Sequence, residues 1–167
     1  MFRILILMLI CQLAVALAAF TLPVIAPAAS LALDIPNNFI GYYTSVMLIG
    51  ATISTLVTSA FVHRYGALRV SQITLIFAGL GLFILQLVTF PYAIFPTFLL
   101  SACLIGFAYG PANPASSHLL VRETPTHLRG RVLSIKQAAI PAAGAISGFA
   151  MPLIEDAIGW ENTSLLA

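Results

Sequence analysis

Side chains able to do covalent or metal chemistry are few in this sequence and are not spaced for it. The three histidines, His63, His118 and His127, include no pair at i and i+4, the helical spacing that suits metal ligands. Cys11 and Cys103 lie inside apolar runs, so they predict neither a metal cluster nor a disulfide framework. No nucleophile stands at a workable distance from a base. The sequence therefore predicts no enzyme, no metal site and no cofactor.

Uncharged polar side chains inside apolar runs are more informative. They are the amides Gln12, Gln86, Asn113 and Gln137. An unsatisfied amide in hydrocarbon costs several kcal/mol, so we expect each to face a cavity or a hydrogen-bonding partner. Lys136, beside Gln137, could attract an anion, although a basic residue near a helix end more often sets topology. The chemistry that these groups suit is non-covalent.

A stripe of small and hydroxyl side chains follows in the second apolar run. Offsets of 3, 4 and 7 place them on one face of a helix. They are Thr44, Ser45, Ala51, Thr52, Thr55, Thr58 and Ser59. Such hydroxyls return to backbone carbonyls or bridge helices, for about 1 kcal/mol or less. Two interpretations stay open: helix packing, which is favoured, and the lining of a permeation path.

The amino-acid composition indicates that the helices carrying these polar residues lie in a membrane. The 167-residue chain is 60% hydrophobic and 7% charged, and its mean hydropathy is +1.05. Soluble domains carry roughly a quarter charged residues, so this apolar surface must face lipid. This excludes a nucleic-acid binder, a disulfide scaffold and a large soluble enzyme.

Five apolar runs are long enough to cross a bilayer. A hydrocarbon core of ~30 Å needs about 20 helical residues, so we predict spans at residues 4–25, 39–62, 68–90, 94–121 and 132–154. The stretch from Ser30 to Asn38 predicts a loop with a helix cap. The predicted fold is an all-α polytopic bundle of transmembrane helices, forming one domain over residues 1–167.

All seven basic residues fall on one side of this scheme. They are Arg3, Arg64, Arg69, Arg122, Arg129, Arg131 and Lys136, whereas four of the five acids fall on the other side. The positive-inside rule then predicts a cytoplasmic amino terminus and an external carboxy terminus in the cell membrane. A cleaved signal peptide is an alternative for the first run, which continues past the small residues Ala16 to Ala19 and is longer than a usual signal core.

Three segments carry a family resemblance. Ser59 to Arg69 resembles the major facilitator superfamily signature Gly-x-x-x-Asp-Arg-x-Gly followed by basic residues: Arg64, Gly66 and Arg69 match, while Ser59 and His63 depart from it. The other two segments resemble the fourth helix with its exit loop and the fifth helix of that family. Their matching residues are Gly106, Gly110, Pro114, Pro125, Arg129, Gly130, Ser134, Ile135, Lys136, Gln137, Pro141, Gly144 and Gly148.

The resemblance implies a secondary transporter in which two six-helix halves rock about a central site. The substrate-lining candidates that it implies are Gln12, Asn113, Ser117 and Gln137. The gating candidates are His63, Arg64, Gly66 and Arg69. Small residues suited to close helix packing are Gly106, Gly110, Gly144 and Gly148. His63 in place of the acid puts the usual charge network of the turn in doubt, and Ala102 removes an arginine used by many proton-coupled members.

Five spans are fewer than the twelve usual in that family, so we expect a partial transporter of a small solute, incomplete alone. Its expected partners are the lipid bilayer, a small-molecule solute, and either a second copy or the missing carboxy-terminal half; no nucleic acid is expected. The alternative is a non-transporting accessory subunit or a non-functional remnant.

Overall fold

The protein is all-helical in the part that the structure describes. The computed structural model describes residues 2–36, 38–85, 94–159 and 163. The elements are α1 (Phe2–Leu33), α2 (Asn38–Tyr65), α3 (Ala67–Leu85), α4 (Ile94–Glu123), the 3₁₀ turn η3 (Thr126–Leu128), α5 (Arg129–Gln137) and α6 (Ala139–Ile158). Five helical segments are long and apolar enough to cross a membrane, with α5 and α6 together forming the fifth. This confirms the predicted polytopic bundle; Gln86 lies outside the described residues.

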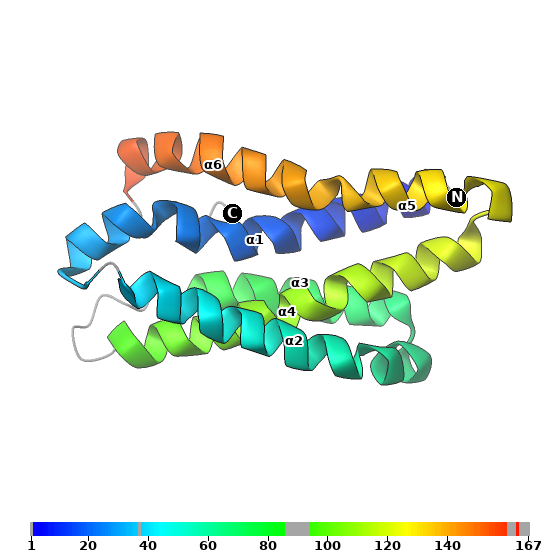
Figure 1. The fold of residues 1–167 in the computed structure, drawn as a ribbon, viewed down its shortest axis with the longest axis horizontal. Helices are drawn as coiled ribbons and strands as arrows, with labels where there is room; N and C mark the ends of the chain where they lie inside the picture. The colour runs from blue at the N-terminus through cyan, green and yellow to red at the C-terminus, as the bar shows by residue number, and fades with distance from the viewer. Residues whose placement is uncertain (1, 37, 86–93, 160–162, 164–167) are drawn as a thin grey trace.

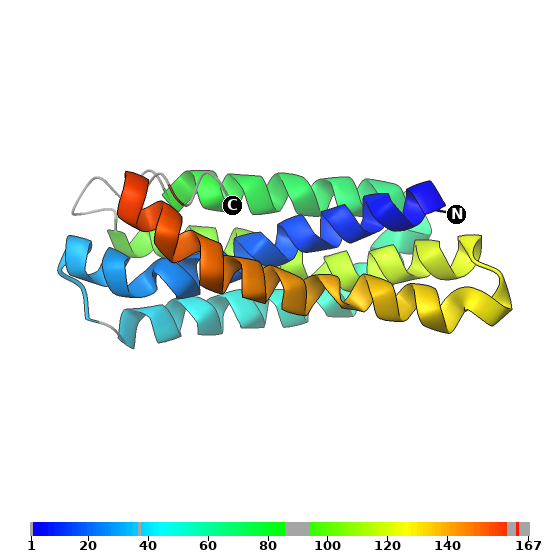
Figure 2. The same ribbon diagram turned by 90° about the horizontal axis from the view of Figure 1, so that it is seen from above.

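The helices form two groups that lie side by side along one axis (Figure 1). In the first group, α4 lies between α2 and α3 and packs against both. In the second, α1 packs along α5 and α6, as the view from above also shows (Figure 2). Contacts of α1 with α4 and α3 join the groups, whereas α2 has few contacts with α1. The bundle is therefore less tightly closed between α2 and the α1–α6 pair.

The first helix runs further than the sequence predicts. It continues through Pro23 and Pro27 to Leu33 instead of ending near residue 25. A proline removes one backbone donor, and neighbouring helices and hydroxyl side chains can satisfy the carbonyl that it frees. The carbonyls that Pro23 and Pro27 leave without a helical donor are those of Ala19 and Pro23, four residues earlier. One turn further on, Ser30 Oγ donates to the Pro27 carbonyl oxygen at 2.8 Å. Asp34 follows the helix with a φ of 51°, where the chain turns toward α2.

The fifth span is interrupted near its amino-terminal end. Pro141 has no backbone N–H to donate to the carbonyl oxygen of Gln137, four residues earlier. The helix is interrupted at Ala138, between α5 and α6, although the two continue in nearly one line (Figure 1). This break allows the short α5 to set its side chains against α4 independently of α6.

Close approach of α2 to α4 depends on two glycines. A Cβ at Gly106 would overlap the Met47 carbonyl oxygen, and one at Gly110 would overlap the Ala51 carbonyl oxygen. The α6 glycines differ. A Cβ at Gly144 would lie at ordinary contact distance, 3.9 Å, from the Phe20 ring, and one at Gly148 would have no described atom within 4 Å. The packing expected at Gly148 is therefore not made within the described residues.

A buried hydroxyl pair connects α2, α3 and α4. Ser101 Oγ donates to the Gly81 carbonyl oxygen at 2.8 Å and lies 3.3 Å from the hydroxyl of Tyr43. Outside this core the surface is apolar, with large side chains such as Leu56 (79% exposed) and Phe149 (77%). Such a surface is stable only in lipid or against further protein.

Candidate functional site

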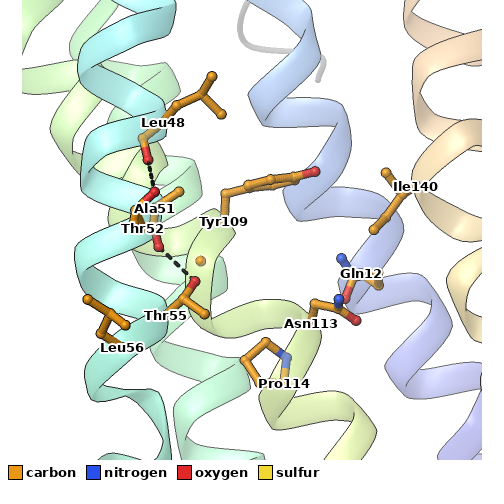
Figure 3. A pocket seen from close by; sticks show the side chains of 11 residues that line it. Gln12, Leu48, Ala51, Thr52, Thr55, Leu56, Tyr109, Asn113, Pro114 and Ile140 are labelled. Carbon is orange, nitrogen blue, oxygen red and sulfur yellow. Dashed lines mark hydrogen bonds between the residues drawn. The ribbon is translucent and has the colours of Figure 1, made fainter.

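A cavity of about 410 Å³ lies between α2 and α4 on one side and α1 and α6 on the other. Figure 3 shows the side chains that line it: Gln12 of α1, Leu48, Thr52, Thr55 and Leu56 of α2, Tyr109, Asn113 and Pro114 of α4, and Ile140 of α6. Sites for small molecules commonly measure about 300–1,000 Å³ and combine apolar walls with a few placed polar groups. This cavity has both properties.

Two amides form the polar wall of the cavity (Figure 3). Gln12 is 1% exposed, and its Oε1 accepts a hydrogen bond from Ser116 Oγ at 3.4 Å. Its Nε2 has no hydrogen-bond partner in the described part of the chain. An unpaired buried amide donor is costly, so it is a group that a bound molecule could satisfy. Asn113, one turn before Ser117 on α4, stands beside it.

Lys136 of α5 hydrogen-bonds to this wall from the side away from the cavity. Its side chain is fully buried, and its Nζ donates to Asn113 Oδ1, to the Asn113 carbonyl oxygen at 3.0 Å and to Ser117 Oγ at 3.1 Å. These bonds use all three ammonium protons. The oxygens of Asn113 are thus turned toward α5, and the Nδ2 of its side chain has no hydrogen-bond partner among the described residues.

The structure corrects the interpretation of α5. Gln137, expected to reach into the site, is exposed and makes none of these contacts, while its neighbour Lys136 is buried. Successive side chains on a helix differ by about 100° in direction, so only one of the two can face α4. A sequence signal for Lys136 existed: it falls between the buried Val132 and Ala139, at the spacing of one helix face. The frequent role of lysine as a topological signal at helix ends favours the opposite, exposed position.

The hydroxyls of α2 are satisfied within their own helix. Thr52 and Thr55 line the cavity, but their hydroxyls donate to the carbonyl oxygens of Leu48 and Ala51, at 2.9 and 2.7 Å (Figure 3). Thr58 does the same toward Ser54, at 2.7 Å. Thr52 and Thr55 therefore line a cavity without offering it free donors, and their part in a permeation path stays a prediction.

The four gating candidates lie together at the turn between α2 and α3. His63, Arg64, Gly66 and Arg69 are all exposed there. The Arg64 guanidinium lies 5.4 Å from the centre of the Tyr65 ring, and the His63 ring lies 5.9 Å from that of His118 on α4. This turn is separate from the cavity described above.

Gly66 makes this turn possible. Its φ is +84°, in the left-handed region that glycine adopts without strain, and its N–H donates to the Val62 carbonyl oxygen at 2.9 Å to end α2. We predict that Gly66→Val lowers the free energy of unfolding by about 1–3 kcal/mol, as expected for a side chain held in that region. Unfolding in mixed detergent micelles, followed by helical circular dichroism, measures the change. Gly79→Val, in α3 with open space at the Cβ position and no positive φ, is the control; equal losses in the two variants would contradict the role of φ.

The fold and this cavity together define a polytopic membrane protein with a partly polar cavity between its helices. The chain belongs to the Major Facilitator Superfamily, since the model of that family matches residues 8–167. The match confirms the resemblance of the three sequence segments and identifies the chain as part of a transporter family.

Two curated relatives are transporters by name. The chain is 28% identical over 126 residues to the multidrug efflux pump Tap of Mycolicibacterium fortuitum, covering 75% of this chain and 30% of the pump. It is 31% identical over 130 residues to the probable anion transporter 2, chloroplastic, of Oryza sativa subsp. japonica, covering 76% of this chain and 23% of that protein. The chain thus spans less than a third of the length of either relative. No solved structure matches it significantly.

Proposed function

We propose that the protein acts as the amino-terminal part of a secondary transporter for a small solute, and that the cavity between α1, α2, α4 and α6 holds that solute. The observation that carries this proposal is the polar wall. Gln12 and Asn113, from helices far apart in sequence, line the same cavity, and Ser117 contributes to the lysine contact behind it. Polar side chains are costly at membrane depth, so a pair of them on one cavity wall marks a candidate functional site.

One side of the cavity is open, which supports the proposal that these five spans form only part of a transporter. Leu48 and Leu56 line the cavity and are 50% and 79% exposed. A solute held against these five spans alone would remain open to lipid on that side. We propose that further helices, from the carboxy-terminal half or from a second copy, close it and make alternating access possible.

Orientation follows from the distribution of charge. The amino terminus, the α2–α3 turn and the α4–α5 turn lie at one end of the bundle (Figure 1), and these are the places that carry the basic side chains. Asp34, Glu155 and Asp156 belong to the opposite end. We propose that the basic end is cytoplasmic, with the end of α6 outside.

Filling the cavity tests the proposed solute site. We predict that Thr55→Trp lowers solute uptake or efflux at least 5-fold, because overpacking by about 1–3 kcal/mol corresponds to roughly 5- to 150-fold in affinity. Transport of radiolabelled benzoate and of ethidium is measured in cells that express the complete gene encoding the chain.

The matched control is Ile53→Trp, two residues away on the same helix, where the native side chain is 51% exposed and does not line the cavity. This variant should transport like the wild type at equal abundance in the membrane. Unchanged transport by Thr55→Trp, or no transport of either probe by the wild type, would contradict the proposal.

A further inference from the structure

The cavity of the proposed transporter has a distinct electrostatic character. Among the described residues, Lys136 is the one Asp, Glu, Lys or Arg side chain that is buried. All its hydrogen-bond partners are neutral: the two oxygens of Asn113 and the hydroxyl of Ser117. A buried cation in a membrane is normally paired with an anion, because its charge is poorly screened in a low dielectric. No carboxylate in the described part of the chain contacts the Lys136 ammonium.

The hydrogen-bonding groups of the cavity wall have the same polarity. The Asn113 Oδ1 is engaged by Lys136, so its amide offers only its N–H groups elsewhere. The Gln12 Oε1 accepts a hydrogen bond from Ser116, and the Gln12 Nε2 is buried without a hydrogen-bond partner among the residues that the structure describes. Both amides therefore present donors, and a ligand in contact with them must supply acceptors. The hydrogen bond from the ammonium to Asn113 further polarises that amide toward donation.

The remaining walls are mainly apolar. Leu48, Leu56, Ile140 and the ring of Tyr109 line the cavity together with the methyl groups of threonines whose hydroxyls are bonded to α2, and the Tyr109 hydroxyl adds one group that can donate or accept. A small, fully hydrated anion would gain nothing from these surfaces, whereas an apolar body attached to the anionic group would bury area against them. The volume of about 410 Å³ accommodates a molecule with one or two rings.

We propose that the solute of this site is an organic carboxylate, whose carboxylate oxygens accept hydrogen bonds from Gln12 Nε2 and Asn113 Nδ2 and whose charge is balanced through Asn113 by Lys136. This inference rests on the proposed solute site, and it assigns to that site a class of substrate. Lys136 acts as a positioning residue, since it fixes the direction of the Asn113 amide and supplies charge without lining the cavity itself.

Binding of matched probes to the purified chain in detergent micelles tests the inference. Equilibrium dialysis of radiolabelled benzoate against protein-containing and protein-free micelles measures affinity, and benzamide, benzylamine and inorganic phosphate serve as competitors. Benzamide retains the ring without the charge, benzylamine reverses the charge, and phosphate is an anion without the apolar body. We expect benzoate to bind at least 10-fold more tightly than any of the three.

Two substitutions separate charge from fold. Lys136→Met keeps a long buried side chain and removes the charge, and it should weaken benzoate at least 10-fold without weakening benzamide. Asn113→Asp is nearly isosteric; it places a carboxylate on the ammonium and replaces the Nδ2 donor by an acceptor, so benzoate binding should be lost while the thermal midpoint is maintained. If Lys136→Met does not fold, benzoate binding by Asn113→Asp still tests the carboxylate assignment. The control is Arg131→Gln, an exposed cation at the same end of the bundle, and it should bind like the wild type.

The outcomes distinguish the substrate class from the proposed function. If benzamide binds as tightly as benzoate and neither variant changes the affinity, the carboxylate assignment is overturned while a solute cavity remains. If phosphate competes as strongly as benzoate, an inorganic anion replaces the organic one and the assignment is likewise overturned. If none of the probes binds, the assignment fails, and the Thr55→Trp transport measurement then decides separately whether the cavity carries a solute at all.

Discussion

Gly110→Leu is expected to prevent the normal packing of α2 on α4 and to lower the free energy of unfolding by more than about 3 kcal/mol, at or beyond the usual range for overpacking. The reason is geometric. Even a Cβ at this position would overlap the Ala51 carbonyl oxygen and Ser54 Oγ, and it would lie 2.8 Å from Thr55 Oγ1. A backbone carbonyl inside a helix cannot rotate away as a side chain can, so the two helices would have to separate.

Equilibrium unfolding in mixed micelles, monitored by circular dichroism, measures this loss. Gly148→Leu is the matched control, because a Cβ at Gly148 would have no described atom within 4 Å. We expect the control to change stability by no more than about 0.5 kcal/mol. Similar stability of the two leucine variants would show that α2 and α4 do not approach each other as described. Separation of the helices would also remove Thr55 from the cavity wall, so Gly110→Leu should lose solute binding.

Labelling of introduced cysteines is expected to give an all-or-none result for orientation. With Cys11 and Cys103 replaced by alanine, His127→Cys places a thiol on the exposed η3 turn, and Asp34→Cys places one in the turn at the opposite end. A membrane-impermeant maleimide added to intact cells should label Asp34→Cys and leave His127→Cys unlabelled. The physical cause is the retention of basic loops in the cytoplasm during insertion.

Permeabilised cells provide the control, since both cysteines should then react. Labelling of His127→Cys in intact cells would reverse the proposed orientation, and labelling of both would contradict a single topology. The same labelling also gives the membrane side of the gating candidates Arg64 and Gly66, because the α2–α3 turn lies at the same end of the bundle as η3 (Figure 1).

The candidate site could be predicted only in part. Gln12 and Asn113 were identifiable because an amide inside an apolar run needs a partner, and the structure places both on one cavity wall. The distance between Gln12 and Asn113 could not be predicted from the sequence, because it depends on how α1 packs against α4. The choice between Lys136 and Gln137 was also undetermined. The direction of each side chain depends on the rotation of α5, which follows the interruption at Ala138.

The amino-acid sequence by itself determined the class of fold. Apolar runs of sufficient length must become helices in hydrocarbon, because every backbone N–H and C=O there needs an internal partner, and the positions of the arginines divide the loops into two sets. The tertiary structure decided which helices touch and which side chains meet: the glycine contacts of α2 with α4, the absence of such a contact at Gly148 among the described residues, and the burial of Lys136 behind Asn113. Hydrophobicity sorts segments between water and lipid, but it is nearly uniform around helices of this composition, so shape and a few hydrogen bonds choose the partners.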